Sequence, residues 1–226
     1  MKQALQKAGR GFFLVATLLA TVARGDLIAQ YSFTATNLDV TLGHPNITAS
    51  SISNGGALSQ CLVNASLAYS TTPVLQVNPN ATFASTNVSA SFASNNFFQF
   101  TITVDPGLTL SLSNLSFNVA RGGSSSTRYT GVRTDLTGAT NLMEFSIAAV
   151  RPTWLVTNLD LSAMPQLQNI SGSVTFLFAV ATPSSGNSLE FDDITLTGSV
   201  IPEPSSLWLT ATALLALCGW HARRTN

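Results

Sequence analysis

The stretch Phe97-Phe98-Gln99-Phe100-Thr101-Ile102-Thr103-Val104 decides the fold class of this chain. Its apolar side chains recur at every second position from Phe98 to Val104, which is the period of a β-strand with one buried face. Asp105-Pro106-Gly107 follows directly and predicts a turn, because proline presets φ and glycine tolerates a positive φ. This part of the chain therefore predicts a strand that ends in a tight turn.

The same alternation predicts strands on both sides of this stretch. Apolar residues alternate at 27, 29, 31 and 33 and at 174, 176, 178 and 180, and a final strand is expected from Leu189 to Leu196. Between these, apolar residues fall on even positions from 108 to 112 but on odd positions from 115 to 119. Because a one-residue slip moves side chains to the other face of a strand, we expect a bulge or tight turn at Ser113-Asn114.

Segments rich in Ser, Thr, Asn and Gly separate the predicted strands, at residues 50–56, 85–96 and 122–127. No stretch between residues 26 and 200 has sustained helical periodicity. Strands of this length, split by turn-rich segments, predict an all-β fold, an antiparallel β-sandwich that is jelly-roll-like.

The N-terminal segment has the three parts of a secretory signal peptide. Lys2, Lys7 and Arg10 precede an apolar run over residues 12–22, and small residues follow. We expect cleavage after Gly25, with Ala23 as the second choice, so that residues 1–25 are removed and the exported domain spans residues 26–200.

Residues 201–226 form a distinct C-terminal tail. Pro202-Glu203-Pro204-Ser205-Ser206 leads into an apolar segment, Leu207–Trp220, which Arg223 and Arg224 close. The two prolines lack N–H donors, so we expect the Pro-Glu-Pro segment to be extended, accessible and outside any sheet. The apolar segment predicts a single, short transmembrane helix, with the arginines on the cytoplasmic side.

This tail resembles the PEP-CTERM sorting domain of exported bacterial proteins, in the order of Pro-Glu-Pro motif, apolar segment and Arg-Arg stop. The resemblance implies a sorting and processing role for Pro202, Glu203, Pro204, Ser205, Arg223 and Arg224. It implies recognition by an exosortase-type membrane protease that cuts near the motif, in a Gram-negative bacterium that makes exopolysaccharide. The protein would cross the inner membrane, be anchored transiently, and reach the cell surface or extracellular matrix.

The charge of the predicted exported domain excludes some partners. Four arginines (Arg121, Arg128, Arg133 and Arg151) stand against nine acidic residues, which gives a net charge of −5, and there is no lysine. Nucleic-acid binding requires phosphate-neutralising Lys and Arg, so we expect no nucleic-acid partner.

The acidic residues near the end of the domain are candidate calcium ligands. Phe191-Asp192-Asp193-Ile194-Thr195-Leu196 resembles the last strand of jelly-roll carbohydrate-binding modules, in some of which an acidic residue here helps to hold calcium. The candidates are Glu190, Asp192 and Asp193. Alternation predicts Glu190 and Asp192 on one face and Asp193 on the other, so the favoured interpretation is a surface-exposed strand end without a metal.

Residues that carry catalysis are sparse. His44 is the one histidine of the domain, in a turn-like Leu-Gly-His-Pro setting, and a single histidine excludes a two-histidine zinc motif. Cys61 has no partner for an internal disulfide, and we expect it to be a buried apolar residue. Glu144 and Glu190 are the domain's two glutamates, so a carboxylate pair of the glycosidase type would have to use them.

The sequence therefore predicts a non-enzymatic, exported surface or exopolysaccharide-matrix-associated protein without a cofactor. The first alternative is a carbohydrate-binding module, with or without a stabilising calcium ion, in which Tyr129 and Trp154 stack on sugar rings. The second is a secreted jelly-roll hydrolase that depends on Glu144 or Glu190.

Overall fold

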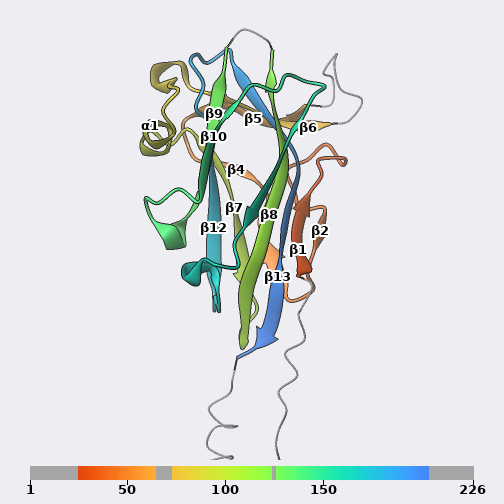
Figure 1. Cartoon of the computed structure of the whole chain (residues 1–226). Coiled ribbons are helices and arrows are strands. Elements are labelled where there is room, and N and C mark those ends of the chain that lie inside the picture. The colour runs from red at the N-terminus through yellow and green to blue at the C-terminus, as the bar shows by residue number, and fades with distance from the viewer. Residues whose placement is uncertain (1–24, 65–72, 124–125, 204–226) are drawn as a thin grey trace, which may run out of the picture.

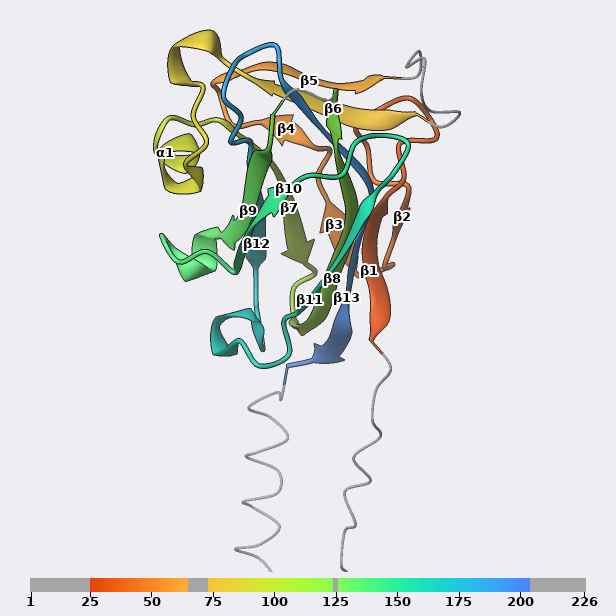
Figure 2. The same cartoon turned by 45° about the horizontal axis from the view of Figure 1, so that its top comes forward.

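The computed structural model describes residues 25–64, 73–123 and 126–203. These residues form two antiparallel sheets that pack face to face (Figures 1 and 2). The prediction of an all-β antiparallel sandwich is thereby confirmed. The predicted signal peptide, apart from Gly25, and the predicted transmembrane segment lie outside the described residues.

Sheet A has the order β11-β8-β13-β1-β2, and β6 also pairs with β13 and carries β5 on its other edge. Its strands are β1 (Asp26–Tyr31), β2 (Leu42–Gly43), β5 (Leu58–Asn64), β6 (Val74–Pro79), β8 (Leu108–Gly122), β11 (Leu155–Asp160) and β13 (Ser188–Pro202). The long strands β8 and β13 pair along their whole lengths and form its centre.

Sheet B has the order β10-β9-β12-β7-β3, and β4 also pairs with β7. Its strands are β3 (Ile47–Ala49), β4 (Ser53–Asn54), β7 (Phe97–Val104), β9 (Arg128–Thr134), β10 (Met143–Ile147) and β12 (Ser173–Ala179). Three short 3₁₀ turns, η1 (Ala81–Phe83), η2 (Asp135–Thr137) and η3 (Pro165–Leu167), lie in the connections.

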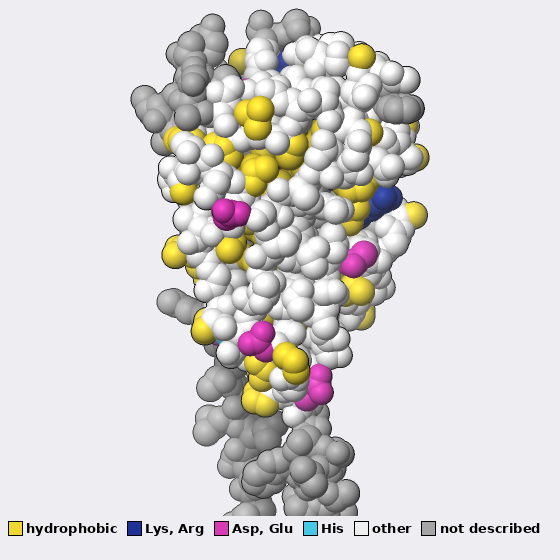
Figure 3. Space-filling view, turned by 180° about the vertical axis from the view of Figure 1, so that it is seen from behind, with side chains coloured by type: hydrophobic (Ala, Val, Ile, Leu, Met, Phe, Trp, Pro, Cys, Tyr) yellow, Lys and Arg dark blue, Asp and Glu magenta, His cyan; other side chains and the backbone are white. Residues whose placement is uncertain are grey.

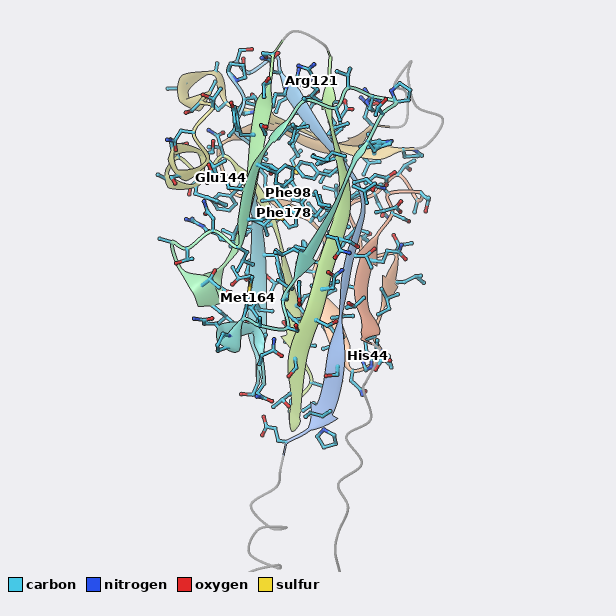
Figure 4. The ribbon with its side chains drawn as sticks, in the orientation of Figure 1. His44, Phe98, Arg121, Glu144, Met164 and Phe178 are labelled. Atoms are coloured by element: carbon cyan, nitrogen blue, oxygen red, sulfur yellow. The ribbon has the colours of Figure 1, made fainter. Side chains whose placement is uncertain are left out.

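The core is a cluster of phenylalanines between the sheets. Phe98 stacks on Phe178 with ring centroids 4.7 Å apart, and both belong to sheet B. Phe117 and Phe191 of sheet A meet Phe178 edge-on, with ring centroids 5.3 and 6.0 Å away. Phe98 and Phe178 lie between the sheets in Figure 4. Period-two alternation in each strand thus supplies the inner faces of the sandwich.

The turn at Asp105-Pro106-Gly107 is confirmed. The Leu108 N–H donates to the Asp105 carbonyl at 3.2 Å, and Gly107 has a φ of +80°. A positive φ at the third position of such a turn is the reason for glycine there. The turn carries the chain from β7 in sheet B to β8 in sheet A.

The bulge expected at Ser113-Asn114 is also confirmed. Thr197 pairs with Asn114 and Gly198 with Leu112, so Ser113 is an extra residue of β8 opposite β13. Because of this insertion, Leu110 and Leu112 are buried on the same side as Leu115.

A similar bulge corrects the alternation expected from residue 27. The pairing of β1 with β13 shifts between Leu27 and Ala29, so that Ile28 and Ala29 are both buried while Leu27 is half-buried. The second half of the predicted pattern holds, because Tyr31 and Phe33 are buried.

One short helix, α1 (Val88–Ala93), lies in the segment 85–96 that the sequence predicts to be a loop. The Asn87 side chain caps it by accepting from the Ala90 N–H at 2.9 Å. Val88 and Phe92 pack with Phe97, Ala179 and Ala181 on the outer face of sheet B. Tertiary packing, not propensity, holds so short a helix.

Both ends of the described sandwich lie at one end of the molecule (Figure 1). Asp26, at the start of β1, pairs with Gly198 near the end of β13. Within the described residues no helix has the length and apolar character needed to cross a membrane.

The prediction that the Pro-Glu-Pro motif lies outside any sheet is wrong for its first residue. Pro202 is the last residue of β13 and pairs with Leu108, and the Glu203 N–H donates to the Gly107 carbonyl at 2.9 Å. Successive residues of a strand direct their hydrogen-bonding groups to opposite sides, and Glu203 bonds toward β8. The nitrogen of Pro202, which has no hydrogen, therefore faces the other edge of β13, where β1 no longer pairs with it. Pro202 and Glu203 are exposed, as expected.

Candidate functional site

The outer face of sheet A carries rows of uncharged polar side chains. One row crosses four strands, because Asn158 pairs with Ser116, Ser116 with Thr195, and Thr195 with Gln30. Asn114 and Thr197 pair in the next row. We call these side chains the polar face; they are Gln30, Asn114, Ser116, Asn118, Asn158, Thr195 and Thr197. Asn158 is exposed and the others are half-buried.

The strands explain this composition. The residues between these positions point inward, and Leu115, Phe117 and Leu196 are buried in the core. The alternate side chains must therefore face outward, where amides and hydroxyls keep their hydrogen bonds with water. Figure 3, which shows the molecule from behind, likewise has few charged side chains on its surface.

The two aromatic candidates are not brought together. Trp154 directly precedes β11, at the edge of sheet A, and is half-buried. Tyr129 lies on β9 in sheet B, where it packs against the buried side chains of α1 and its neighbours on the outer face of that sheet. Trp154 is thus the aromatic candidate nearer to the polar face, whereas Tyr129 packs within the protein, in sheet B.

Glu190 corrects the prediction of an exposed strand end. Its side chain is fully buried, and its carboxylate forms an ion pair with Arg151 from the β10–β11 connection. Ala120, its neighbour across the strand pair, is also fully buried. The β10–β11 connection runs beside β8 here, since the Arg121 N–H donates to the Ala149 carbonyl at 2.9 Å.

Asp193 corrects the predicted division of the acidic residues between two faces. The β8–β13 pairing shifts between Asp192 and Thr195, and Asp193 has a φ of +49°. This bulge turns Asp193 to the solvent, where its carboxylate accepts from Asn118 Nδ2 at 3.3 Å. Asn118 belongs to the polar face, so Asp193 lies on the same side of the sheet.

Asp192 has a perturbed carboxyl. Burial, together with the neighbouring Asp193 charge, raises the pKa of Asp192 to about 6. Over the described ranges, no group of three or more His, Cys, Asp and Glu side chains is placed to hold a metal ion. Calcium binding stays a sequence prediction, and Glu190 is already neutralised by Arg151.

Arg121 and Arg128 form a second feature that the sequence predictions did not assign to a site. Arg121 ends the inward-facing series of Leu115, Phe117 and Val119, and Arg128 begins the inward-facing series of β9. Both lie at the end of the sandwich opposite its termini, where Figure 4 labels Arg121. An arginine in phase with buried apolar residues is a signal that the sequence already contained.

The candidate catalytic residues are dispersed. Glu144 is exposed on β10 in sheet B, whereas Glu190 is buried in sheet A, so the two glutamates of the hydrolase alternative lie in different sheets. Figure 4 places Glu144 and His44 far apart on the ribbon. His44 Nδ1 accepts from the Asn46 N–H at 3.2 Å.

Cys61 agrees with the apolar interpretation. It lies in β5, half-buried and packed against the core, and burial raises the pKa of its thiol to about 11. A thiol with this pKa stays protonated at neutral pH and is a poor nucleophile.

A shallow hollow of about 240 Å³ lies beside η2 and η3. Its lining is uncharged and comes from Leu136, Thr137, Thr140, Asn141, Leu142, Met164 and Gln166. No atom of these side chains is among the buried, unpaired polar atoms.

No protein-family model matches the sequence, and no curated protein matches it. Similar solved structures include the CBM22-1 xylan-binding domain of Xyn10C from Paenibacillus barcinonensis, with a TM-score of 0.45 and 12% identity over 77% of this chain and 95% of that chain. TmCBM61 in complex with β-1,4-galactotriose has a TM-score of 0.37 and 9% identity over 76% and 94% of the two chains.

The K3 adhesin domain of Lys-gingipain from Porphyromonas gingivalis W83 has a TM-score of 0.41 and 12% identity, over 76% of this chain and 98% of that chain. At these identities and TM-scores, none of the three assigns a function or a binding residue to this chain.

Proposed function

We propose that this chain is a non-catalytic, exported protein that binds polysaccharide at the cell surface or in the exopolysaccharide matrix. The row Asn158–Ser116–Thr195–Gln30 across four strands is the observation that carries the proposal. Amides and hydroxyls can both donate and accept hydrogen bonds, which suits the many hydroxyls of a sugar chain. Regular strands hold these groups at fixed spacings, so little ordering is needed on binding.

Trp154 supplies the apolar part of this surface. It directly precedes β11, two positions before Val156, which is 72% exposed. A half-buried indole offers a rigid, flat surface for the apolar face of a sugar ring at low entropic cost. Trp154 and the polar face would therefore act together.

The arrangement of the ends suits presentation of the domain away from a membrane. The described sandwich begins and ends at the same end, so a tail inserted in a membrane would leave the opposite end pointing away from it. By its resemblance, the tail would be cut near Pro202–Ser205 by an exosortase-type protease, with Arg223 and Arg224 as the cytoplasmic stop. The domain would then be released or retained by the matrix that it binds.

The test is affinity electrophoresis of the full-length chain in gels that contain a soluble polysaccharide, either neutral dextran or an acidic uronate polymer. We expect retardation of the wild type in at least one gel. Trp154→Ala and Asn158→Ala should each weaken the apparent affinity about tenfold, the effect of losing one good contact of about 1.4 kcal/mol.

The matched control is Gln99→Ala, which removes an amide from the outer face of sheet B. It should migrate like the wild type. Equal retardation of all four proteins would contradict the assignment to the polar face, and no retardation of the wild type would contradict the function.

A further inference from the structure

Two arginines face the space between the sheets, at the end of the sandwich opposite the termini. Arg128 is only 1% exposed, although it is among the largest side chains of the core. Its Nη2 reaches the Gly122 carbonyl at a long 3.5 Å, and its Nε and Nη1 have no hydrogen-bond partner. Arg121 is half-buried, and its Nε is likewise buried without a partner.

The chain supplies no carboxylate to neutralise them. Glu190 is the acidic residue at this end of the sheet, and Arg151 already forms an ion pair with it. Residues 65–72 and 124–125 contain no Asp or Glu, and neither do residues 204–226. Among the described residues, therefore, neither Arg121 nor Arg128 forms an ion pair with a carboxylate, and their two positive charges remain uncompensated.

Such an arrangement is costly without an anion. Burial, with the nearby charge of Arg121, lowers the pKa of Arg128 to about 10. A buried charge is normally paired, because desolvation otherwise costs several kcal/mol. An arginine keeps its proton even so, and hence attracts a counter-ion.

We infer that Arg121 and Arg128 bind the carboxylate or sulfate group of an acidic sugar. A planar guanidinium matches a two-oxygen anion with paired N–H donors, and the partly exposed Arg121 is the point of approach. This inference rests on the proposed function and deepens it. The polar face takes the hydroxyls of the polymer, and the arginine pair selects polymers that carry acid groups.

The test uses the purified full-length chain at constant ionic strength, with sodium glucuronate, sodium sulfate and glucose as separate probes. Glucuronate and sulfate should raise the melting temperature of the wild type, whereas glucose should not, since only a ligand of the folded state stabilises it. Calorimetric titration should give an affinity for glucuronate that falls about 10- to 100-fold in Arg121→Gln.

Arg133→Gln is the matched control. It removes the fourth arginine of the domain, which lies over the Phe92 ring at 3.9 Å on the outer face of sheet B, and it should keep the wild-type affinity. Arg128→Lys tests the buried arginine, because it keeps the charge but loses the fork of donors. It should bind more weakly than the wild type. Equal stabilisation of the wild type and Arg121→Gln, or no stabilisation of the wild type, would overturn the inference.

Polymers separate this inference from the proposed function. If uronate polymer and neutral dextran retard the wild type equally and glucuronate does not bind, the arginine site fails and polysaccharide binding stands. If glucuronate binds through Arg121 but no polymer is retarded, the anion site stands as a small-molecule site and the proposed function fails.

Discussion

At the scale of single residues, Glu190 departs most from what the sequence predicts. Period-two alternation correctly places it on the outer side of β13, away from Leu189 and Phe191. Outward-facing positions are usually solvated, but here Arg151, from the β10–β11 connection beside β8, pairs with the carboxylate, and the Glu190 side chain is buried. Local alternation carries no information about a loop that arrives from about forty residues away.

The buried ion pair leads to a prediction about stability. Glu190→Gln leaves the buried Arg151 guanidinium without its carboxylate, and we expect the free energy of unfolding to fall by about 3 kcal/mol. Urea denaturation followed by tryptophan fluorescence measures it. Glu144→Gln makes the same chemical change at an exposed position and should lower the stability much less. Equal losses in the two variants would show that the ion pair contributes no net stability.

At the scale of elements, the bulges explain where the predictions succeed and fail. The change of parity between Leu112 and Leu115 is visible in the sequence, because leucines flank it, and the predicted bulge at Ser113 is confirmed. The bulge at Asp192–Asp193 also changes the parity of the buried positions, from odd at Phe191 to even at Ile194. The two residues between them are acidic, however, so the change is harder to recognise in the sequence. The helix α1 gives no periodic signal over six residues and depends on the surface beneath it.

Gly131 is the position in sheet B that admits this helix. A Cβ on Gly131 would lie 2.5 Å from Val88 Cγ1, so Gly131→Ala should displace α1 and cost about 1–3 kcal/mol through overpacking. Val88→Ala in the same chain should recover part of that loss, because it removes the methyl group that clashes. Unfolding free energies of both single variants and the double variant measure the coupling. Strictly additive losses would contradict the proposed contact.

At the scale of the whole molecule, the termini and the tail are linked through one strand. β13 ends at Pro202, and the Glu203 N–H still bonds to the turn at Gly107. A protease that binds its substrate in extended form would have to separate the end of β13 from β8 before it could cut upstream of Glu203. The sandwich thereby sets an upstream limit to the processing that the tail's resemblance implies.

Intact mass of the protein isolated from its own cells tests this processing. We expect a mature chain that begins at Asp26 and ends between Glu203 and Ser205, and a variant with Pro202→Ala and Pro204→Ala that retains Asn226. Pro45→Ala, in the exposed β2–β3 connection, is the control and should be processed like the wild type. Retention of Asn226 in all three proteins would identify the apolar segment as a permanent anchor.

The sequence by itself determined the class of fold, the main strands, the turn at Gly107 and the bulge at Ser113. Period-two burial and turn chemistry are local properties, and neighbouring residues are enough to express them. Only the tertiary structure decided that Glu190 is buried, that Asp193 faces solvent, that Tyr129 and Trp154 lie apart, and that Arg121 lies near Arg128. These facts depend on which distant segments pack together, and pairing across two sheets is a property of the whole chain.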